Sequence, residues 1–232
     1  MKDRLCMMVL LAGVAWGSSA HAHITVGSGP ATANSNNEVT FTVGHGCAGA
    51  DTYRVTIDIP SGVTGVRPLR SDFGAPSVEK DLAGTITSVT WQKSLADALA
   101  ADIALYKLVI RMKTPDQAFS TLYFAAHQTC RAADGTMTTV DWVGTPAQET
   151  DGGTVEPAPG LLVVPARLPG WNKYKLTGAM TDLSVFFKDA QIVWQGTSAY
   201  SANPSTVALI AGTSGVTPLT ALKAGDEIWV KY

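Results

Sequence analysis

Short segments in which apolar and polar residues alternate run from residue 23 to residue 143, and they constrain the fold more than any other feature. Alternation of period two is typical of strands that bury one face. Turn-forming residues separate these segments at intervals of roughly 8–12 residues, which predicts an all-β sandwich. One short helix is expected at residues 95–101, where Ala and Leu cluster. The predicted strands are residues 23–26, 38–43, 53–59, 65–69, 88–91, 106–112, 121–126, 138–143 and 161–164.

The chain divides into two parts. A polar stretch rich in Gly and Pro, residues 144–160, leads to the last of these strands. We therefore assign residues 23–165 to the sandwich, residues 166–170 to a linker and residues 171–232 to a small second β domain of unknown role. A segment of this size is marginal for an independent core. Its aromatic residues at 192–200 faintly resemble those of small polysaccharide-binding modules, although such spacing is also typical of a small core. Its predicted strands are residues 183–187, 190–194 and 227–230.

The N-terminus has the pattern of a signal peptide. Lys2 and Arg4 precede an apolar run, residues 5–16, and Ala20-His21-Ala22 fits the small-x-small cleavage site. The run is too short to cross a bilayer core of about 30 Å, and no later stretch offers a stable membrane span. We expect residues 1–22 to be removed, and the protein to be periplasmic or secreted, with His23 as its first residue.

Charge and cysteine content narrow the function. The chain has 17 Lys and Arg against 19 Asp and Glu, with no basic run, which argues against a nucleic-acid partner. Of the three cysteines, Cys6 leaves with the signal peptide. Cys47 and Cys130 remain, and in an oxidising compartment such a pair predicts a disulfide. The alternative is a thiolate metal site.

Strand pairing predicts a cluster at one end of the sandwich. If residues 23–26 pair antiparallel with residues 38–43, the chain that leaves the second strand brings His45 near His23. A Cys47–Cys130 bond would add the segment that holds His127 and Gln128. The turn signal at 133–136 would then place Asp141 and Trp142 opposite those two residues.

This cluster could bind copper. An N-terminal His offers its α-amine and its ring Nδ1 to one ion, and two nitrogens from one residue favour Cu(II). We take His23, His45 and Asp141 as candidate metal ligands, with Trp142 as a neighbour of the site. Structural roles stay open for the last three: a turn hydrogen bond for His45, a solvated strand-end acid for Asp141, and the core for Trp142. His127 could equally be a surface residue.

A series of motifs resembles the YcnI-like family of exported bacterial copper-binding proteins. The resemblance covers residue 23 to about residue 165 and leaves residues 171–232 unexplained. The series consists of His23-Ile24-Thr25-Val26, His45-Gly46-Cys47, Thr56-Ile57-Asp58-Ile59-Pro60-Ser61-Gly62-Val63, Val89-Thr90-Trp91, Lys113-Thr114-Pro115-Asp116, Leu122-Tyr123-Phe124, Gln128-Thr129-Cys130, Trp142 and Glu156-Pro157-Ala158-Pro159.

The resemblance implies an immunoglobulin-like sandwich of the fibronectin-III type. It also implies Cu(II) held in a monohistidine brace by His23, with an acidic ligand nearby and a characteristic Trp at Trp142. Such proteins handle copper outside the cytoplasm, beside a copper importer or other copper protein. One departure concerns the acid: Lys107 stands where many members carry a Glu, so the identity of the acidic ligand stays open.

Three functions compete at this stage. The first is copper trafficking or acquisition without catalysis, and no catalytic residue is assigned. The second is a copper-dependent polysaccharide monooxygenase-like enzyme, in which His45 or His127 would be a second histidine ligand. The third is a non-catalytic protein that binds a cell wall or a partner. The chain contains no nucleophile elbow, phosphate loop or HExxH motif, which disfavours hydrolases.

Overall fold

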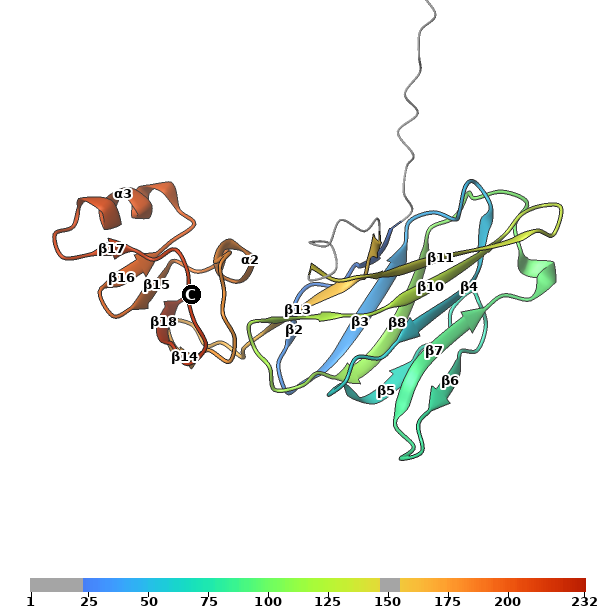
Figure 1. Ribbon diagram of the computed structural model, residues 1–232, viewed down its shortest axis with the longest axis horizontal. Helices are drawn as coiled ribbons and strands as arrows, with labels where there is room; N and C mark the ends of the chain where they lie inside the picture. Colours follow the sequence, from blue (N-terminus) through green and yellow to red (C-terminus); the bar gives the residue numbers. More distant parts are fainter. Residues whose placement is uncertain (1–22, 147–154) are drawn as a thin grey trace, which may run out of the picture.

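The structure is a computed structural model that describes residues 23–146 and 155–232, so the expected signal peptide lies outside the described residues. Strands dominate it, as the alternation predicts. Two hydrophobic cores form, one in the sandwich and one in the smaller C-terminal part. Figure 1 shows the strands of these two parts. No helix among the described residues is long and apolar enough to cross a membrane.

The sandwich is built from two large sheets and a small third one. The first sheet has the order β1 (Ile24–Val26), β3 (Asn36–Val43), β8 (Tyr106–Lys113), β5 (Thr64–Pro68). The second has the order β12 (Glu156–Pro157), β11 (Met137–Gly144), β10 (Ala126–Arg131), β4 (Asp51–Asp58), β7 (Ile86–Gln92), β6 (Ser77–Lys80). The third joins β2 (Ala31–Thr32), β13 (Gly160–Val164) and β9 (Ser120–Tyr123).

The core lies between the sheets and takes every second residue of the long strands, as period-two alternation requires. In β8 the pattern is regular: Leu108, Ile110 and Met112 are fully buried, whereas the residues between them face outward. The Phe41 and Phe124 rings meet edge to face with centroids 5.1 Å apart. Each such side chain contributes about 1.5–3 kcal/mol through burial.

Two sequence expectations within the sandwich were wrong. Only a short 3-10 helix, η1 (Leu95–Asp97), forms where a helix was expected at residues 95–101. The chain is extended at Ala98, and Leu99 donates its N–H to the Asp51 carboxylate instead of to a helical carbonyl. The expected strand 121–126 is divided between β9, which pairs with β13, and β10, which pairs with β4 and β11, because the chain changes sheets between Tyr123 and Ala126.

The C-terminal part is a five-stranded sheet with two short helices. Its order is β14 (Trp171–Lys175), β18 (Glu227–Lys231), β15 (Ile192–Gln195), β16 (Ser198–Tyr200), β17 (Thr217–Pro218), and the helices are α2 (Ser184–Phe187) and α3 (Pro204–Gly212). The strand expected at 183–187 is helical. Leu183 and Phe187 are both buried, and one helical turn places residues four apart on the same face.

The two cores meet at Phe119. This residue has a left-handed backbone (φ 62°) and lies in the chain that leads into β9. Its ring packs against Tyr174, Phe186 and Phe187 of the C-terminal core, with centroids 5.4, 6.0 and 5.4 Å away. The segment expected as a linker, residues 166–170, is also attached to the C-terminal part, because the Tyr174 hydroxyl donates a hydrogen bond to the Ala166 carbonyl.

Candidate metal centre

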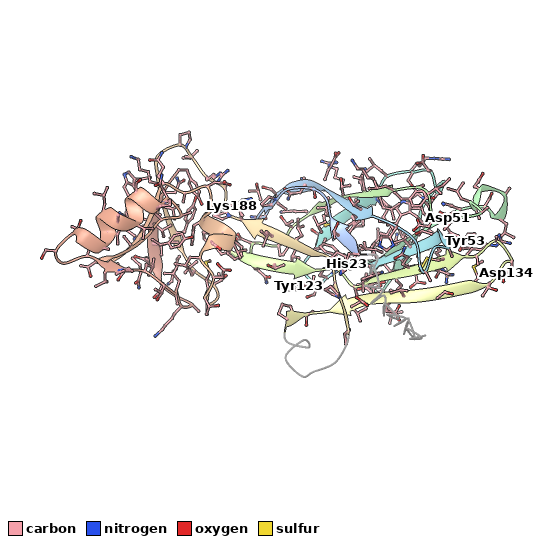
Figure 2. The ribbon with its side chains drawn as sticks, turned by 90° about the horizontal axis from the view of Figure 1, so that it is seen from above. His23, Asp51, Tyr53, Tyr123, Asp134 and Lys188 are labelled. Atoms are coloured by element: carbon pink, nitrogen blue, oxygen red, sulfur yellow. A yellow bond between two sulfur atoms is a disulfide. The ribbon has the colours of Figure 1, made fainter. Side chains whose placement is uncertain are left out.

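His23 immediately precedes β1, which is the edge strand of the first sheet, and Figure 2 labels it on the sandwich. The pairing of β1 with β3 is antiparallel, as expected, with Ile24 opposite Val43. The His23 side chain is exposed, and its ring contacts the ring of Trp142, with centroids 5.3 Å apart and planes inclined by 42°. Trp142 itself is buried, so one face of the site is a rigid indole.

A buried amide fixes the orientation of that indole. Trp142 donates from Nε1 to Oε1 of Gln128 at 3.1 Å. Gln128 in turn donates from Nε2 to the His45 carbonyl and to the Thr52 hydroxyl, at 2.9 and 2.8 Å. Every polar atom of this fully buried amide therefore has a partner, which holds Trp142 in one position. Trp142 lies opposite Ala126 in the ladder, not opposite Gln128 as expected, and reaches Gln128 diagonally.

The loop after β3 is anchored by the disulfide. Cys47 and Cys130 are bonded, as expected, with Cα atoms 5.7 Å apart. Their sulfurs are thus bonded to each other and do not form a thiolate metal site. Gly46 is required beside them, since a Cβ at this position would overlap the Ala50 carbonyl.

The His45 imidazole takes part in its own turn. Its Nδ1 lies 2.9 Å from the Gly46 carbonyl oxygen and 3.9 Å from a carboxylate oxygen of Asp102. The backbone of His45, rather than its ring, connects it to the site through Gln128.

Asp141 lies on the outer face of β11. Its carboxylate is 2.6 Å from Nδ1 of His127, whose Nε2 is 3.5 Å from Asp58. Successive residues of a strand point to opposite faces, and here Asp141 is exposed whereas Trp142 is buried. The structure thus places the Asp141 carboxylate away from the Trp142 face that contacts His23, contrary to the expectation that both serve one ion.

The cluster of His127, Asp141 and Asp58 on the outer face leads to a testable prediction. Burial lowers the pKa of His127, but hydrogen bonds to Asp141 and Asp58 outweigh it and raise the pKa above the ordinary 6.5. Because folding raises this pKa, the cluster stabilises the fold fully below about pH 6.5 and loses that effect as pH rises through the folded-state pKa. Asp141→Asn should bring the pKa of His127, measured by NMR titration, back down. Asp134→Asn in the adjacent turn is the control, and an unchanged His127 pKa in Asp141→Asn would contradict the assignment.

Glu156 is the acidic residue that the structure brings to the Trp142 face. Strand β12 pairs in parallel with β11, and Glu156 lies directly opposite Trp142. Directly paired residues lie on the same face of a sheet, and the register of this pairing shifts only beyond Trp142, between Trp142 and Gly144. Gly144 permits this close approach, since a Cβ there would lie 3.0 Å from the carbonyl oxygens of Val155 and Glu156. Glu156 is half-buried, so part of it is accessible.

Sequence reasoning did not select Glu156 as a ligand. The Glu156-Pro157-Ala158-Pro159 motif is visible in the sequence. The place of Glu156 opposite Trp142, however, depends on a parallel pairing of β11 with β12 that no local pattern predicts. Lys107, which the resemblance aligns with a Glu, is exposed and lies opposite Thr42 in the first sheet. Lys107 therefore supplies no acid, and Glu156 is a carboxylate in a position to do so.

The donor set fits an ion held largely by one residue. Among residues 23–146 and 155–232, no three His, Cys, Asp or Glu side chains gather in a metal-holding group. A tetrahedral zinc centre needs three or four separate protein ligands. Cu(II) stays a prediction: if cleavage leaves His23 at the N-terminus, its α-amine and Nδ1 would supply two nitrogens, and Glu156 could add an oxygen.

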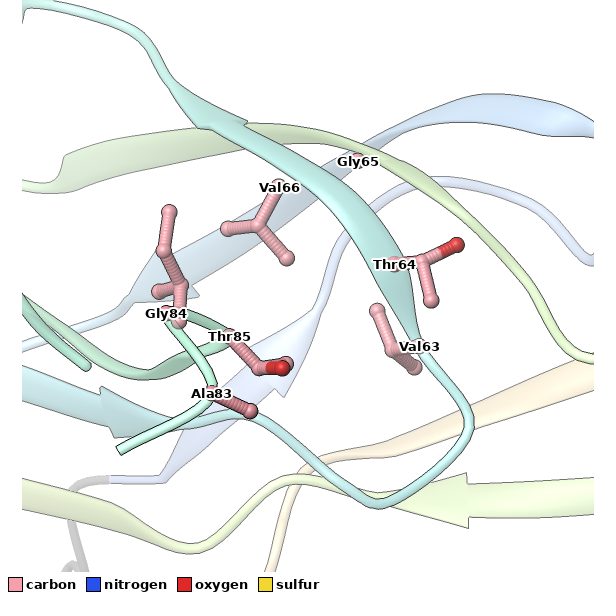
Figure 3. Close-up of a pocket in the computed structure, with 8 residues that line it drawn as sticks. Val63, Thr64, Gly65, Val66, Ala83, Gly84 and Thr85 are labelled. Atoms are coloured by element: carbon pink, nitrogen blue, oxygen red, sulfur yellow. The ribbon is translucent and has the colours of Figure 1, made fainter. Parts of the chain in front are cut away.

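A hollow elsewhere on the sandwich offers no chemistry comparable to that of the His23 site. It lies between Val63–Val66 and the turn before β7, and Figure 3 shows its small aliphatic and hydroxyl lining. None of the eight described residues that line it is ionisable. The hollow also lies at the Lys113 end of β8. The candidate site lies near the other end of β8, because Val43 pairs both with Ile24, next to His23, and with Tyr106.

Comparison with known proteins identifies the family of the sandwich. Residues 23–74 and 74–163 match the family described as a domain of unknown function, DUF1775. The chain belongs to the DUF1775 family. The matched region ends within β13, so the C-terminal sheet of this DUF1775 protein lies beyond it.

Two solved structures are similar to the DUF1775 sandwich. An uncharacterised protein from Nocardia farcinica, described as immunoglobulin-like, is 24% identical, covers 61% of this chain and 98% of its own, and has a TM-score of 0.49. The major pilin subunit BcpA of Bacillus cereus is 13% identical, with 62% and 38% covered and a TM-score of 0.35. No curated protein matches the chain.

Proposed function

We propose that this protein is an exported, non-catalytic copper-binding protein of the YcnI-like type, which holds Cu(II) through the α-amine and imidazole of His23. The observation that carries the proposal is the contact between the exposed His23 ring and the buried Trp142 ring. Cleavage after Ala22 would free the amine beside that imidazole. Copper is the cargo, taken up or passed on outside the cytoplasm, with a copper importer or another copper protein as partner.

Two residues support this assignment: Trp142, which contacts His23, and Glu156, which pairs with Trp142. Glu156 shares the face of Trp142 and could supply a carboxylate oxygen, which suits the mixed nitrogen and oxygen environment that Cu(II) favours. Trp142 covers one side of His23 with an indole face, which attracts cations and limits the approach of other ligands.

The hydrogen bonds of the other histidines favour binding over catalysis. A monooxygenase-like site would need a second histidine ligand beside His23. The His45 ring is held by Gly46 near Asp102, and the His127 ring is held by Asp141. Both nitrogens of the His127 ring lie beside carboxylates on the outer face of the sheet, so His127 is a poor second ligand and single-histidine copper binding is the better proposal.

Electron paramagnetic resonance of the Cu(II)-loaded protein tests this function. The protein that begins at His23 should bind one Cu(II) with a nitrogen signature, and His23→Ala should lose it. Glu156→Gln should weaken Cu(II) binding by at least about tenfold, because substitution even of residues that only support the ligands commonly has an effect of this size. Asp141→Asn is the matched acidic control and should leave copper binding unchanged. Stoichiometric binding by His23→Ala would refute the proposal, and a larger loss in Asp141→Asn than in Glu156→Gln would reassign the acid.

A further inference from the structure

Three tryptophans form an open platform on the C-terminal sheet. Trp171, Trp229 and Trp194 come from the adjacent strands β14, β18 and β15, and Trp194 lies directly opposite Trp229. These three side chains alone line a shallow hollow of about 230 Å³. Adjacent strands lie about 4.8 Å apart, so the platform spans roughly 10 Å across the sheet.

The platform is not part of the core of this small domain. Ile228, Val230 and Val193 point to the other face of the same strands and are fully buried. By contrast, Trp171 and Trp229 are 50% and 48% exposed. The aromatic run 192–200 serves both purposes left open by the sequence, because Trp194 lines this hollow whereas Tyr200 packs against the core. A cluster of exposed apolar side chains with polar surroundings is typical of a binding surface.

Positive charge surrounds the tryptophans. On the same outer face lie Lys173 beside Trp229 and Lys231 beside Trp171, each opposite its neighbour in the ladder. Lys175 follows on β14, opposite Glu227. The Lys173 ammonium lies 2.8 Å from the Glu227 carboxylate. This face of the sheet therefore carries three ammonium groups and one carboxylate. The surface therefore combines flat aromatic rings with a net excess of cations.

We propose that the Trp171–Trp194–Trp229 platform binds an acidic polysaccharide. The C–H faces of pyranose rings stack on exposed indoles, and carboxylates of uronic-acid units pair with ammonium groups through charge-assisted hydrogen bonds. The span of about three strands matches a short run of sugar units. This proposal is independent of copper binding, because the platform lies outside the sandwich.

Size and charge disfavour two other occupants. Half-exposed tryptophans offer about 100 Å² each, given that a buried Trp covers roughly 150–250 Å². Their sum is well below the roughly 800 Å² per partner of a stable protein interface. Single-stranded nucleic acid requires a longer cationic groove than three lysines provide.

Affinity electrophoresis of the full chain tests the proposal with polygalacturonate in the gel and dextran as the neutral comparison. The wild-type protein should be retarded by polygalacturonate, and Trp229→Ala and Trp171→Ala should each weaken that binding at least about tenfold. Lys231→Gln should weaken it severalfold. Leu209→Ala, at an exposed site on α3, is the matched control and should bind as wild type.

Several results would overturn this inference. They are no retardation by polygalacturonate, equal retardation of wild type and Trp229→Ala, or binding to phosphatidylglycerol vesicles or oligo-dT in place of the polysaccharide. Concentration-dependent dimerisation abolished by Trp229→Ala would likewise show that a second copy occupies the platform. Circular dichroism spectra and thermal unfolding like those of the wild-type protein would show that the variants are folded.

Discussion

Replacing Asp51 with alanine should destabilise the sandwich by about 3–5 kcal/mol, because it leaves a buried lysine without a counter-charge. Asp51 is fully buried at the start of β4, and Lys93 is only 4% exposed. Their charged groups are 2.6 Å apart. The Tyr106 hydroxyl donates to the second carboxylate oxygen at 2.6 Å, and Leu99 donates its N–H to the first.

The loss should exceed that of an ordinary hydrogen bond for a specific reason. The Lys93 ammonium lies among aromatic rings, 4.0 Å from the Tyr106 centroid and 4.9 Å from that of Phe73. Water cannot easily replace Asp51 there. Burial, and then the hydrogen bond to Asp51, also raise the pKa of the Tyr106 hydroxyl, so it remains a neutral donor.

Urea denaturation would measure this effect. The control is the double variant Asp51→Leu/Lys93→Met, which removes both charges and should recover much of the lost stability, since buried ion pairs can often be replaced by apolar residues. A loss below about 1 kcal/mol in Asp51→Ala would contradict the assignment of the cluster as a buried, mutually dependent unit.

Removal of the Cys47–Cys130 disulfide should cost about 4.5 kcal/mol, since the bond joins residues 83 positions apart and restricts the unfolded chain accordingly. The double variant Cys47→Ala/Cys130→Ala and the reduced wild-type protein should show the same loss. Denaturation with and without reductant measures it, and reductant should have no effect on the double variant. Equal stability of the oxidised and reduced wild-type proteins would contradict this expectation.

The sequence predicted those features of the sandwich that arise from short-range patterns. Period-two alternation located the long strands, because it reflects which face of each strand is buried. The turn at 133–136 correctly placed Asp141 opposite His127. The same register places Trp142, the next residue, opposite Ala126. Asp141 and Trp142 therefore point to opposite faces of the sheet, which the sequence analysis did not predict.

The parts that sequence reasoning missed depend on distant segments. Glu156 reaches Trp142 through a parallel pairing between β11 and β12. Phe119 enters the C-terminal core from the sandwich, which no local pattern indicates. The segment that forms α2 is a short apolar run, and such runs do not distinguish helix from strand. Exposure of the three tryptophans likewise depends on which face of the sheet the second core covers.

A one-residue extension tests the central claim most directly. Adding a single alanine before His23 retains the imidazole, Trp142 and Glu156 but moves the free amine away from residue 23. Competition titration, followed by Cu(II) quenching of tryptophan fluorescence, would compare the extended protein with the form that begins at His23. We expect the extension to weaken Cu(II) binding by at least about 100-fold, or about 2.7 kcal/mol. Equal affinity of the two forms would contradict copper binding by the N-terminal amine and imidazole of His23.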